Sequence, residues 1–452
     1  MLFLYNSVVI IATQLLKIVA LFSPKTKLFV NGRKNVFQQL ERKISPTDKT
    51  IWFHAASLGE FEQGLPVMEK IKIQYPNHKI VVTFFSPSGY EVRKNNSVAD
   101  VTVYLPLDTK SNAKRFLQII NPELVFFIKY EYWPNYLNEL KQLEIKTYLI
   151  SGIFREDQAF FKWYGGFYKN ALKTFDYFFV QNDNSKVLLQ KLGFNNVKVS
   201  GDTRFDRVVS ILERDNSLEF MEEFIKSSST ALGMKNSTAL EVTNSTAPVI
   251  TKSTEIKTTI PAASETAQLV VIGSSWPKDE HYIVSYINQH SGNFKFIFAP
   301  HNIKTEQIQE LKKSISKKTI LFSEKENQKL ENFQVMIVDT IGILTKVYSY
   351  ADIAYVGGGF GTAGLHNILE PATFGTPIII GPNYSNFSEA IALVNLGGCV
   401  SVANQQELNE NFDLMLQNED ERHEKGHICA TFVQMNKGAT NSILNHITNS
   451  EK

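Results

Sequence analysis

TIWFHAASLGEFEQG, residues 50–64, joins a short apolar run to the start of a helix through a turn of small residues. The run TIWFH is typical of a strand that is buried on both faces. The segment from Phe61 to Ile73 has a helical pattern. A buried strand that leads directly into a helix is the repeating unit of a parallel α/β sheet. The stretch therefore predicts a strand–turn–helix unit with Glu60 at its turn.

The same alternation continues on both sides of this stretch and occurs twice in the chain. A first set of apolar runs lies between Thr50 and Gly201, with helical segments such as Thr109 to Ile120 between them. The runs are TIWFH, KIVVTFF, VTVYL, ELVFFI, KTYLI, YFFV and VKVS. A second set follows Ala267 and comprises QLVVIGS, FKFIFAP, TILF, FQVMIV, DIAYVGG, TPIII and GCVSV. Two doubly wound α/β halves are therefore predicted.

The composition changes sharply between the two halves. The segment that begins SSSTALGMKNSTALEVTNST is rich in Ser, Thr and Ala, has few aromatic residues and has no sustained period. Such a composition is typical of a flexible insertion. The predicted ranges are an N-terminal helix over 1–22, a first domain over 23–206, a linker over 207–267, and a second domain over 268–452 that ends in helices.

The overall charge and the cysteine content exclude some functions. A formal net charge of +2 over 452 residues gives no support to a nucleic-acid-binding protein, which normally has a strong basic excess. Cys399 and Cys429 are the only cysteines, and their spacing suggests neither a metal site nor a disulfide framework. His54 and His366 have no partner at a recognisable ligand spacing, so no metal is assigned.

The first 22 residues, MLFLYNSVVIIATQLLKIVALF, form the most apolar segment of the chain. They lack the basic start and the cleavage site of a signal peptide. On a helical wheel the polar residues gather on one arc, and lysines and Arg33 follow the segment. We therefore predict an interfacial or shallowly inserted membrane anchor. A spanning helix and a buried first helix of the domain are the alternatives.

A glycine-rich loop is the strongest turn signal of the second half. In YVGGGFGTAGLHNILEPATFGTPIIIGP, residues 355–382, glycines follow an apolar strand and a helix is predicted near Glu370 and Pro371. Glycines let the backbone approach a phosphate, and a helix N-terminus offers free N–H groups. The loop therefore suggests a nucleotide site. An acidic residue at a helix start is also stabilising without a ligand.

Six motifs follow one another along the chain: HAASLGEFEQG, KYEYWPNYL, SGDTRFD, GSSWPKDE, VDTIGILTKVYSYADIAYVGGG and GLHNILEPATFGTPIIIGPNYSNFSEA. In this order they resemble the motifs of the 3-deoxy-D-manno-octulosonic acid (Kdo) transferases of Gram-negative lipopolysaccharide synthesis. The resemblance covers nearly the whole chain except the insertion. It implies a GT-B fold, in which two Rossmann-like domains face each other across a cleft, the first binding the acceptor and the second a CMP-sugar.

The resemblance also implies an activity and a location. The family moves Kdo from CMP-Kdo to a lipid A precursor with inversion at the anomeric carbon, and it requires no metal or other cofactor. The expected partners are thus CMP-Kdo, a lipid A precursor and inner-membrane lipid. The expected location is the cytoplasmic face of the inner membrane of a Gram-negative bacterium, with residues 1–22 as the anchor.

Three catalytic residues follow from the resemblance. Glu60 matches the general base that takes the proton of the acceptor hydroxyl. Glu131 and Arg204 match positions that stabilise the transition state, and a fixed cation there would offset charge on the departing phosphate. A helix cap or an ion-pair partner is the alternative for Glu60, but glutamate is not a favoured N-cap residue, so the catalytic role is preferred. Without the resemblance, Arg204 would be interpreted as a surface arginine paired with Asp202 or Asp206, and Glu131 as a structural hydrogen-bond partner near Trp133.

The donor-binding residues implied by the resemblance lie in three segments of the second half. These are Pro300 and His301; Ile341, Gly342 and Ile343; and Asn367, Ile368, Leu369 and Glu370. Two segments depart from the family pattern. His301 replaces an arginine, and a neutral loop histidine is its alternative interpretation. Ile343 replaces a glutamate, which leaves only backbone contacts to the base.

Three other functions remain open from the sequence. A GT-B enzyme with another donor, such as a UDP-sugar, is suggested by Ile343. A glycosidase would use Glu60 and Glu131 as its carboxylate pair. A catalytically degenerate, membrane-tethered binder of sugar nucleotides would bind without turnover. The number of Kdo units transferred, the acylation of the acceptor and the oligomeric state do not follow from the sequence.

Overall fold

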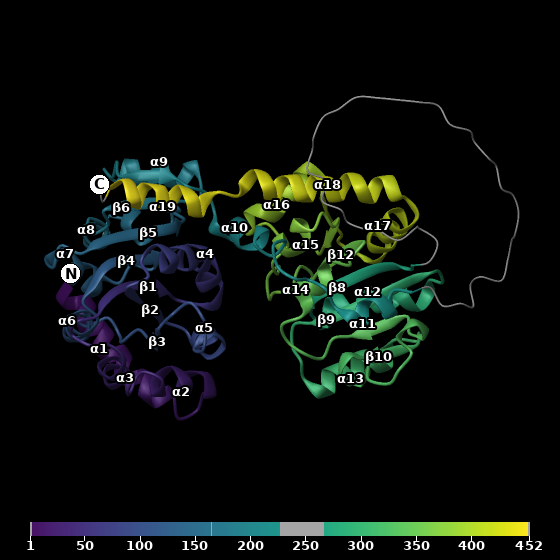
Figure 1. Cartoon of the computed structure of the whole chain (residues 1–452), viewed down its shortest axis with the longest axis horizontal. Coiled ribbons are helices and arrows are strands. Elements are labelled where there is room, and N and C mark those ends of the chain that lie inside the picture. The colour runs from purple at the N-terminus through teal and green to yellow at the C-terminus, as the bar shows by residue number, and fades with distance from the viewer. Residues whose placement is uncertain (1, 164, 227–265, 451–452) are drawn as a thin grey trace, which may run out of the picture. The chain divides into compact units, whose positions relative to one another are not determined.

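The chain folds into two compact units, described here from a computed structural model (Figure 1). The structure describes residues 2–163, 165–226 and 266–450. The first unit comprises Met1–Ser210 together with Asn436–Lys452, and the second comprises Ile211–Met435. Each unit is built around one parallel sheet of seven strands, as the alternating pattern predicts.

The sheet of the first unit has the strand order β3-β2-β1-β4-β5-β6-β7, and its pairs are all parallel. Its strands are β1 Lys49–Ala55, β2 His78–Phe84, β3 Val101–Tyr104, β4 Pro122–Ile128, β5 Lys146–Gly152, β6 Tyr177–Val180 and β7 Val197–Val199. All seven apolar runs predicted in this half form strands. They are paired in the order that right-handed βαβ crossovers produce.

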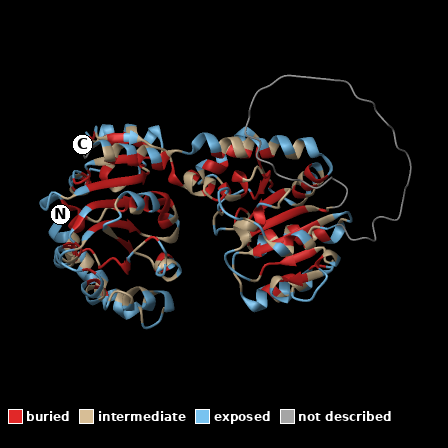
Figure 2. Ribbon diagram, viewed as in Figure 1, coloured by how far each residue is buried: buried red, intermediate tan, exposed pale blue. Residues whose placement is uncertain are grey.

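Both faces of this sheet are buried, which explains why its strands are apolar at nearly every position (Figure 2). Trp52 and Phe127 belong to the apolar cluster on one face, and Phe53 and Phe126 belong to the cluster on the other. Side chains alternate between the faces of a strand, so a sheet covered on both sides needs apolar residues at successive positions. The covering helices supply the rest of each cluster.

The helices of the first unit lie mostly between its strands. They are α1 Leu2–Val19, α2 Pro24–Asn31, α3 Val36–Lys43, α4 Leu58–Gln74, α5 Pro87–Arg93, α6 Lys110–Ile120, α7 Pro134–Gln142, α8 Gly166–Leu172, α9 Asp183–Lys191, α10 Thr203–Val209 and the C-terminal α19 Ala439–Ser450. In α19, Ile443 and Ile447 are fully buried in the same cluster as Phe53 and Phe126. The last helix of the chain is therefore part of the first unit's core.

The second unit repeats the architecture with the strand order β10-β11-β9-β8-β12-β13-β14. Its strands are β8 Gln268–Ser275, β9 Phe294–Pro300, β10 Thr319–Leu321, β11 Val335–Ile337, β12 Ile353–Val356, β13 Ile378–Ile380 and β14 Cys399–Ser401. Its helices are α11 Glu219–Phe224, α12 Pro277–Gln289, α13 Thr305–Ser314, α14 Leu344–Tyr348, α15 Leu369–Thr373, α16 Ser388–Leu396, α17 Gln405–Gln417 and α18 Glu419–Asn436. The seven apolar runs predicted in this half also form strands.

Each sheet has one position where the strand order reverses direction. In the first unit this position lies between β1 and β4, and in the second it lies between β8 and β12. Open α/β sheets bind ligands at the carboxyl ends of the strands on either side of such a reversal. The segments of interest are therefore those that follow β1 and β4 in the first unit and those that follow β8 and β12 in the second.

The compact units divide the chain differently from the predicted ranges in two places. The predicted second domain ran to residue 452, whereas α19 packs in the first unit. Part of the predicted linker is ordered, because Met221 and Phe224 of α11 are fully buried. Residues 227–265 of that linker lie outside the described residues.

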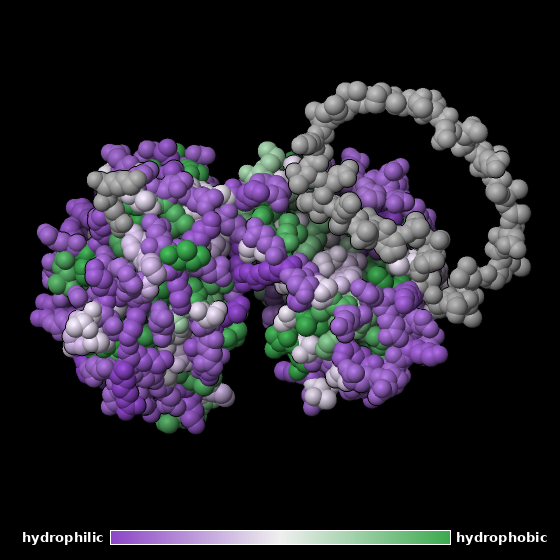
Figure 3. Space-filling view, viewed as in Figure 1, coloured by the Kyte–Doolittle hydropathy of each residue, from purple (hydrophilic) through white to green (hydrophobic). Residues whose placement is uncertain are grey.

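The N-terminal helix α1 has an apolar surface that the rest of the fold does not cover. None of its described residues is buried, which rules out a buried first helix of the domain. The helix is long and apolar enough to cross a membrane by length and composition. Its exposed apolar residues include Phe3, Leu4, Val8, Ile11, Leu15, Ile18 and Val19. The surface of both units in Figure 3 is by contrast mostly hydrophilic.

Candidate active site

Glu60 lies in the first turn of α4, directly after β1 and beside the reversal of the strand order. Its carboxylate Oε2 accepts hydrogen bonds from the backbone N–H groups of Ala56, at 2.5 Å, and Ser57, at 3.1 Å. These bonds satisfy N–H groups just before the helix, as the glutamate of a capping box does. The interpretation of Glu60 as a helix cap is therefore correct, and it leaves the second carboxylate oxygen for other contacts.

Burial makes the Glu60 carboxyl group a weaker acid than an ordinary glutamate. The residue is 5 % exposed. Its pKa is raised to about 7, first by burial and then by the charge of Glu131, against the lowering effect of the two backbone hydrogen bonds and of Lys129. A helix N-terminus alone would lower the pKa. A carboxyl group with a pKa near 7 has the proton affinity that general base catalysis needs near neutral pH.

Glu131 follows β4 and is part of a buried hydrogen-bond network. Its Oε2 accepts a bond of 3.0 Å from Nε1 of Trp133, and the same indole N–H lies 3.0 Å from Nε2 of His54. Because an indole nitrogen only donates, Nε2 of His54 is an acceptor and its proton lies on Nδ1. Nδ1 then donates to the Thr83 hydroxyl at 2.8 Å. The structural hydrogen bond between Glu131 and Trp133 is thus present, and it fixes the Glu131 carboxylate.

Arg204 lies at the start of α10 and is paired with Asp202. Its side chain donates from Nε and Nη2 to Oδ2 of Asp202, both at 2.8 Å, and its backbone N–H binds Oδ1 at 2.9 Å. Asp202 is 7 % exposed and also accepts from the Gln63 side chain of α4. The predicted ion pair with Asp202 is therefore formed. Asp206 instead binds the backbone of Gly438 and Thr440.

The ion pair fixes the guanidinium without burying it. The Arg204 side chain is 31 % exposed. It lies near enough to the Lys129 amine to lower the pKa of that amine, and Glu60 and Asp202 act on the same amine in the opposite direction. Arg204, Lys129 and Glu60 therefore belong to one group of charges at the carboxyl ends of β1 and β4.

Lys129 is a member of this group that the sequence analysis did not identify. It is the first residue after β4 and adopts a positive φ of 72°, which is rare for a residue other than glycine. Burial is the main cause that lowers the pKa of its amine, followed by the charge of Arg204. The motif KYEYWP contains the signal, since a lysine that ends a buried strand at a predicted ligand edge is unusual.

In the second unit the predicted donor-binding segments adjoin one another. Oε2 of Glu370 accepts a bond of 2.7 Å from the hydroxyl of Thr345, which lies in α14 after Ile341–Ile343. Oε1 of Glu370 accepts from the side chain of Asn367 at 3.1 Å. The first bond joins α14, the helix that follows residues 341–343, to the segment 367–370. Both are close to the reversal between β8 and β12.

Side chains and backbone contribute differently within these segments. Ile368 and Leu369 are buried in the core, so only their backbone groups are available to a ligand. Ile341 is 88 % exposed, and Gly342 has a φ of +101°, which favours glycine. Ile343 lies immediately before α14 and offers no side-chain acceptor. The backbone of 341–343 is therefore the part suited to recognise a base.

His301 stacks on aromatic rings instead of standing free as a cation. Its ring lies 4.6 Å from that of Trp276 and 4.5 Å from that of His366, and the Trp276 indole N–H donates to Nε2 of His366 at 3.1 Å. Burial lowers the pKa of His301, and burial together with His301 lowers that of His366 to about 4. Both imidazoles are neutral at pH 7. The segment that begins at Pro300 therefore presents a flat neutral surface.

The glycine-rich loop is held by a buried aspartate. Asp279 of α12 is fully buried and accepts from the Tyr355 hydroxyl at 2.8 Å and from the backbone N–H of Gly358 at 2.9 Å. A Cβ atom on Gly357 would lie 2.4 Å from the carbonyl oxygen of Ser274. The glycine is therefore required for close packing of backbone against backbone, which accounts for it without a ligand. Over the residues that the structure describes, no group of three potential ligand side chains is arranged for a metal ion.

Comparison with known proteins adds evidence of another kind. Residues 31–207 match the sequence model of a family described as "3-Deoxy-D-manno-octulosonic-acid transferase (kdotransferase)". A 3-deoxy-D-manno-octulosonic acid transferase of Chlamydophila psittaci is 26% identical over 391 residues, 84% of this chain and 82% of that protein. The enzyme of the same name from Haemophilus influenzae is 24% identical over 454 residues, covering 98% of this chain and 97% of that protein.

The solved structures add information about the fold alone. A glycosyltransferase from Rickettsia africae superposes with a TM-score of 0.54 at 14% identity, over 90% of this chain and 99% of that protein. This likeness spans the folds of both units. With the two parallel seven-stranded sheets, it confirms the predicted GT-B class.

Proposed function

Because the chain belongs to the 3-deoxy-D-manno-octulosonic acid transferase family and is a glycosyltransferase, we propose that it moves Kdo from CMP-Kdo to a lipid A precursor with inversion. The observation that carries this proposal is the buried Glu60 carboxyl group, with a pKa of about 7, at the strand reversal of the first unit. This residue lies in the stretch that matches the family. A base of this strength is what an inverting transfer to a hydroxyl group requires.

In the proposed step, Glu60 takes the proton of the acceptor hydroxyl as the hydroxyl oxygen attacks the anomeric carbon of Kdo. The bond from that carbon to the CMP phosphate oxygen breaks, and its electron pair leaves with the phosphate. Glu60 becomes neutral in this step, and burial favours the neutral form of a carboxyl group. The rise in pKa that burial causes thus makes Glu60 a stronger base than an exposed glutamate.

Two cations and one carboxylate complete the proposed site. Arg204 is held by Asp202, and Lys129 lies in the same group of charges. A fixed cation stabilises negative charge that develops on a leaving phosphate. Glu131, fixed by Trp133, raises the pKa of Glu60 through its charge. We assign Glu131 to this role, and we assign the phosphate or the sugar carboxylate to Arg204 and Lys129.

In the second unit we assign the donor nucleotide to the segments 300–301, 341–343 and 367–370. Glu370 is a natural acceptor for ribose hydroxyls, and the backbone of 341–343 is available to the base. The neutral stack of His301 on Trp276 favours a ring face over a phosphate. This observation, with the absence of a carboxylate at Ile343, is the reason to test a UDP-sugar as the alternative donor.

Mass spectrometry of the lipid product tests the reaction directly. The purified full-length chain in detergent is incubated with CMP-Kdo and a tetraacylated lipid A precursor, and in parallel with UDP-sugars. We expect a mass gain of one or more Kdo units with CMP-Kdo only, and inhibition by CMP but not by UDP. Release of free Kdo without an acceptor product would favour hydrolysis. Transfer only from a UDP-sugar would favour the alternative donor.

We further propose that α1 lies in the membrane interface and does not span the bilayer. The Tyr5 hydroxyl donates to Asp108 at 2.7 Å, and Asn6 accepts from the Asn135 side chain at 2.8 Å, so the start of α1 is tied to the first unit. Beyond its other end, Phe29 of α2 contacts Phe85 of the same unit. Both ends are thus on one side of the exposed apolar face, which is the geometry of an interfacial anchor.

Protease protection tests this arrangement of α1. With a cleavable tag before Met1, we expect the tag to survive protease added to intact spheroplasts and to be cut after lysis. The reason is that an interfacial helix keeps both ends on the cytoplasmic side. A protein with a known periplasmic tag serves as the control for access. Cleavage of the tag in intact spheroplasts would mean that α1 spans the membrane.

A further inference from the structure

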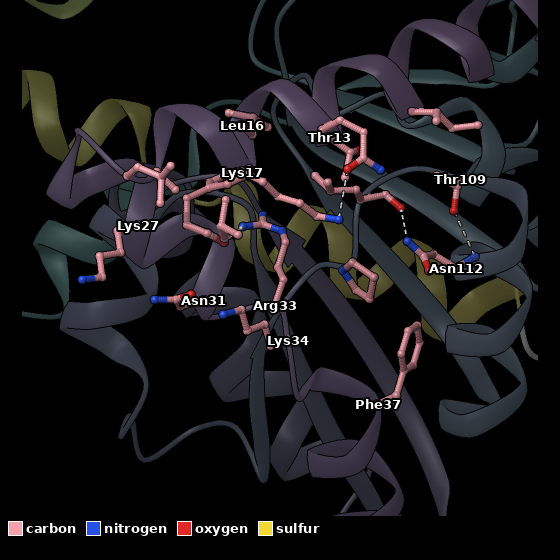
Figure 4. Close-up of a pocket in the computed structure, with 18 residues that line it drawn as sticks. Thr13, Leu16, Lys17, Lys27, Asn31, Arg33, Lys34, Phe37, Thr109 and Asn112 are labelled. Carbon is pink, nitrogen blue, oxygen red and sulfur yellow. Dashed lines mark hydrogen bonds between the residues drawn. The ribbon is translucent and has the colours of Figure 1, made fainter.

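A cavity of about 770 Å³ lies in the first unit beneath α1 (Figure 4). In the figure Thr13, Leu16 and Lys17 of α1 line one side, and Asn31, Arg33 and Lys34 from the end of α2 and the turn after it line the other. Phe29, Val30, Phe37, Pro106 and Leu107 supply apolar surface. The volume is that of a site for a small organic ligand. None of the proposed catalytic or donor-binding residues lines it.

The charge of the cavity has one sign. Its eighteen lining residues include four basic side chains and no acidic one. The basic residues are Lys17, Lys27, Arg33 and Lys34. The acidic residue adjacent in sequence to the lining is Asp108, which is 2 % exposed. Its carboxylate is occupied by the Tyr5 hydroxyl and the backbone of Asn135 and Tyr136. The positive charge is therefore not neutralised within the cavity.

Of the four basic residues, Arg33 is bound to the backbone of the cavity walls and the three lysines are exposed. Arg33 donates to the carbonyl oxygens of Leu105, at 2.9 Å, and Phe85, at 2.7 Å, and burial lowers its pKa to about 10. It therefore holds the walls together. Lys17, Lys27 and Lys34 are exposed at the rim, and among the described residues Lys17 binds only the neutral side chain of Gln14, at 3.2 Å. Three ammonium groups are thus available to an anion.

From this arrangement we propose that the cavity binds an anionic glycerophospholipid of the membrane. The three lysines hold the phosphate of its headgroup, and the apolar wall of Leu16, Phe29, Val30 and Leu107 receives part of an acyl chain. The occupant follows from charge and position together. Basic residues at a membrane surface attract anionic lipids. One side of α1 forms a wall of the cavity, and its outer, apolar side is the one assigned to the bilayer, so the cavity lies next to the lipid.

This site shares no lining residue with the proposed catalytic and donor-binding residues, and its assignment rests on the proposed membrane location of α1. It serves as a lipid-dependent anchor: one bound phospholipid joins α1 to the segment 27–34 through a shared headgroup. Each lysine near an anionic surface contributes about fivefold in affinity, so three give a strong dependence on the headgroup charge. A neutral zwitterionic lipid lacks this contribution.

The test uses a phosphatidylglycerol with a diazirine in its acyl chain. Full-length protein is bound to vesicles of phosphatidylcholine that contain this probe, irradiated, and digested for mass spectrometry. We expect crosslinks in the segment 29–37 and at Leu107, at least about tenfold more than with a phosphatidylcholine probe. Yields are normalised to the amount of protein bound, so that general adhesion to the vesicle is removed from the comparison.

Two variants and a charge-matched control sharpen the result. K17Q/K27Q/K34Q is expected to reduce the crosslinks at 29–37 about tenfold or more, because the headgroup loses its cations. Ala20→Trp fills the cavity without a change in charge and is expected to remove the same crosslinks. K114Q/K173Q/K191Q, which removes three exposed lysines elsewhere in the unit, is expected to leave them within about twofold of wild type.

Three outcomes would overturn the proposal. Crosslinks confined to the outer face of α1 would show that the cavity holds no lipid. Equal labelling by the phosphatidylcholine probe would remove the role of the lysines. Complete displacement by an equimolar lipid A precursor would assign the cavity to the acceptor. The transferase assay in detergent needs no phospholipid, so failure of this proposal is distinguishable from failure of the proposed function.

Discussion

Glu60→Gln is expected to lower the rate of Kdo transfer by about 10²- to 10⁴-fold, the range of general base catalysis. Glutamine keeps an oxygen that accepts from the N–H groups of Ala56 and Ser57, so the start of α4 is preserved. It cannot take a proton from the acceptor. The measurement is the initial rate of lipid product by mass spectrometry, with saturating CMP-Kdo.

The pH dependence of kcat/KM of the wild-type enzyme shows whether Glu60 acts as a general base or only caps the helix. The base acts only as the carboxylate, so kcat/KM is expected to rise with pH and to level off above about 7, where Glu60 is ionised. The exposed Glu69 of the same helix is the matched control, and Glu69→Gln is expected to keep both the rate and the pH profile. A Glu60→Gln enzyme with wild-type rate would leave Glu60 with a structural role alone.

Stability gives an independent check that Glu60→Gln is folded. The folded state raises the pKa of this carboxyl from 4.5 to about 7. The folded protein therefore binds more protons than the unfolded chain between these values, and wild-type stability falls as pH rises through that interval. Above pH 7 the variant is expected to melt no lower than wild type, and the difference is expected to vanish below pH 4.5. A lower melting temperature at pH 8 would point to disrupted packing.

Arg204→Ala is expected to lower the rate of transfer by about 10²- to 10³-fold, the effect of removing one preorganised group that stabilises charge in the transition state. The ion pair with Asp202 fixes the guanidinium and leaves it partly exposed, so its position is set before a ligand binds. Arg204→Lys is expected to recover part of the rate, because lysine keeps the charge but not the two-pronged geometry. Initial rates at saturating donor measure the effect on kcat.

Arg207→Ala is the matched control for this prediction. Arg207 lies on the same helix, and its Nε is paired with Glu62 at 3.0 Å. Its loss removes the same charge from α10 and is expected to lower the melting temperature with little effect on kcat. If both alanine variants lost activity equally, the cause would be the folding of α10. If Arg204→Ala retained full activity, its pairing with Asp202 would be its whole function.

The strands of both units were predictable because their signal is local. A strand buried on both faces has to be apolar at successive positions, as in residues 51–53 and 124–128, and helical segments of ordinary length separate such runs. The edge that carries the site was predictable for the same reason. Once strands alternate with helices, the carboxyl ends of the strands lie at one edge, where Glu60 and the glycine-rich loop were found.

The chemistry of single residues was not predictable, because it depends on contacts between distant parts of the chain. The sequence posed a choice for Glu60 between cap and base, whereas burial and the charge of Glu131 allow both roles at once. Lys129 could have been noticed as the lysine that ends a buried strand in KYEYWP, but its positive φ could not have been predicted from that motif. His301 matched a position where a cation was expected, but Trp276 stacks on it, His366 lies beside it, and burial lowers its pKa. Such effects appear only in three dimensions.

The placement of α19 has a consequence for how the protein is made. The apolar cluster that contains Phe53 and Phe126 includes Ile443 and Ile447, which are synthesised only after the whole second unit. Domains ordinarily fold in the order in which they are synthesised. Here the core of the first unit cannot be completed until α19 has been synthesised, by which time all residues of the second unit have been made. The exposed α1 and the unfinished core must therefore be kept from aggregating until α19 has been synthesised.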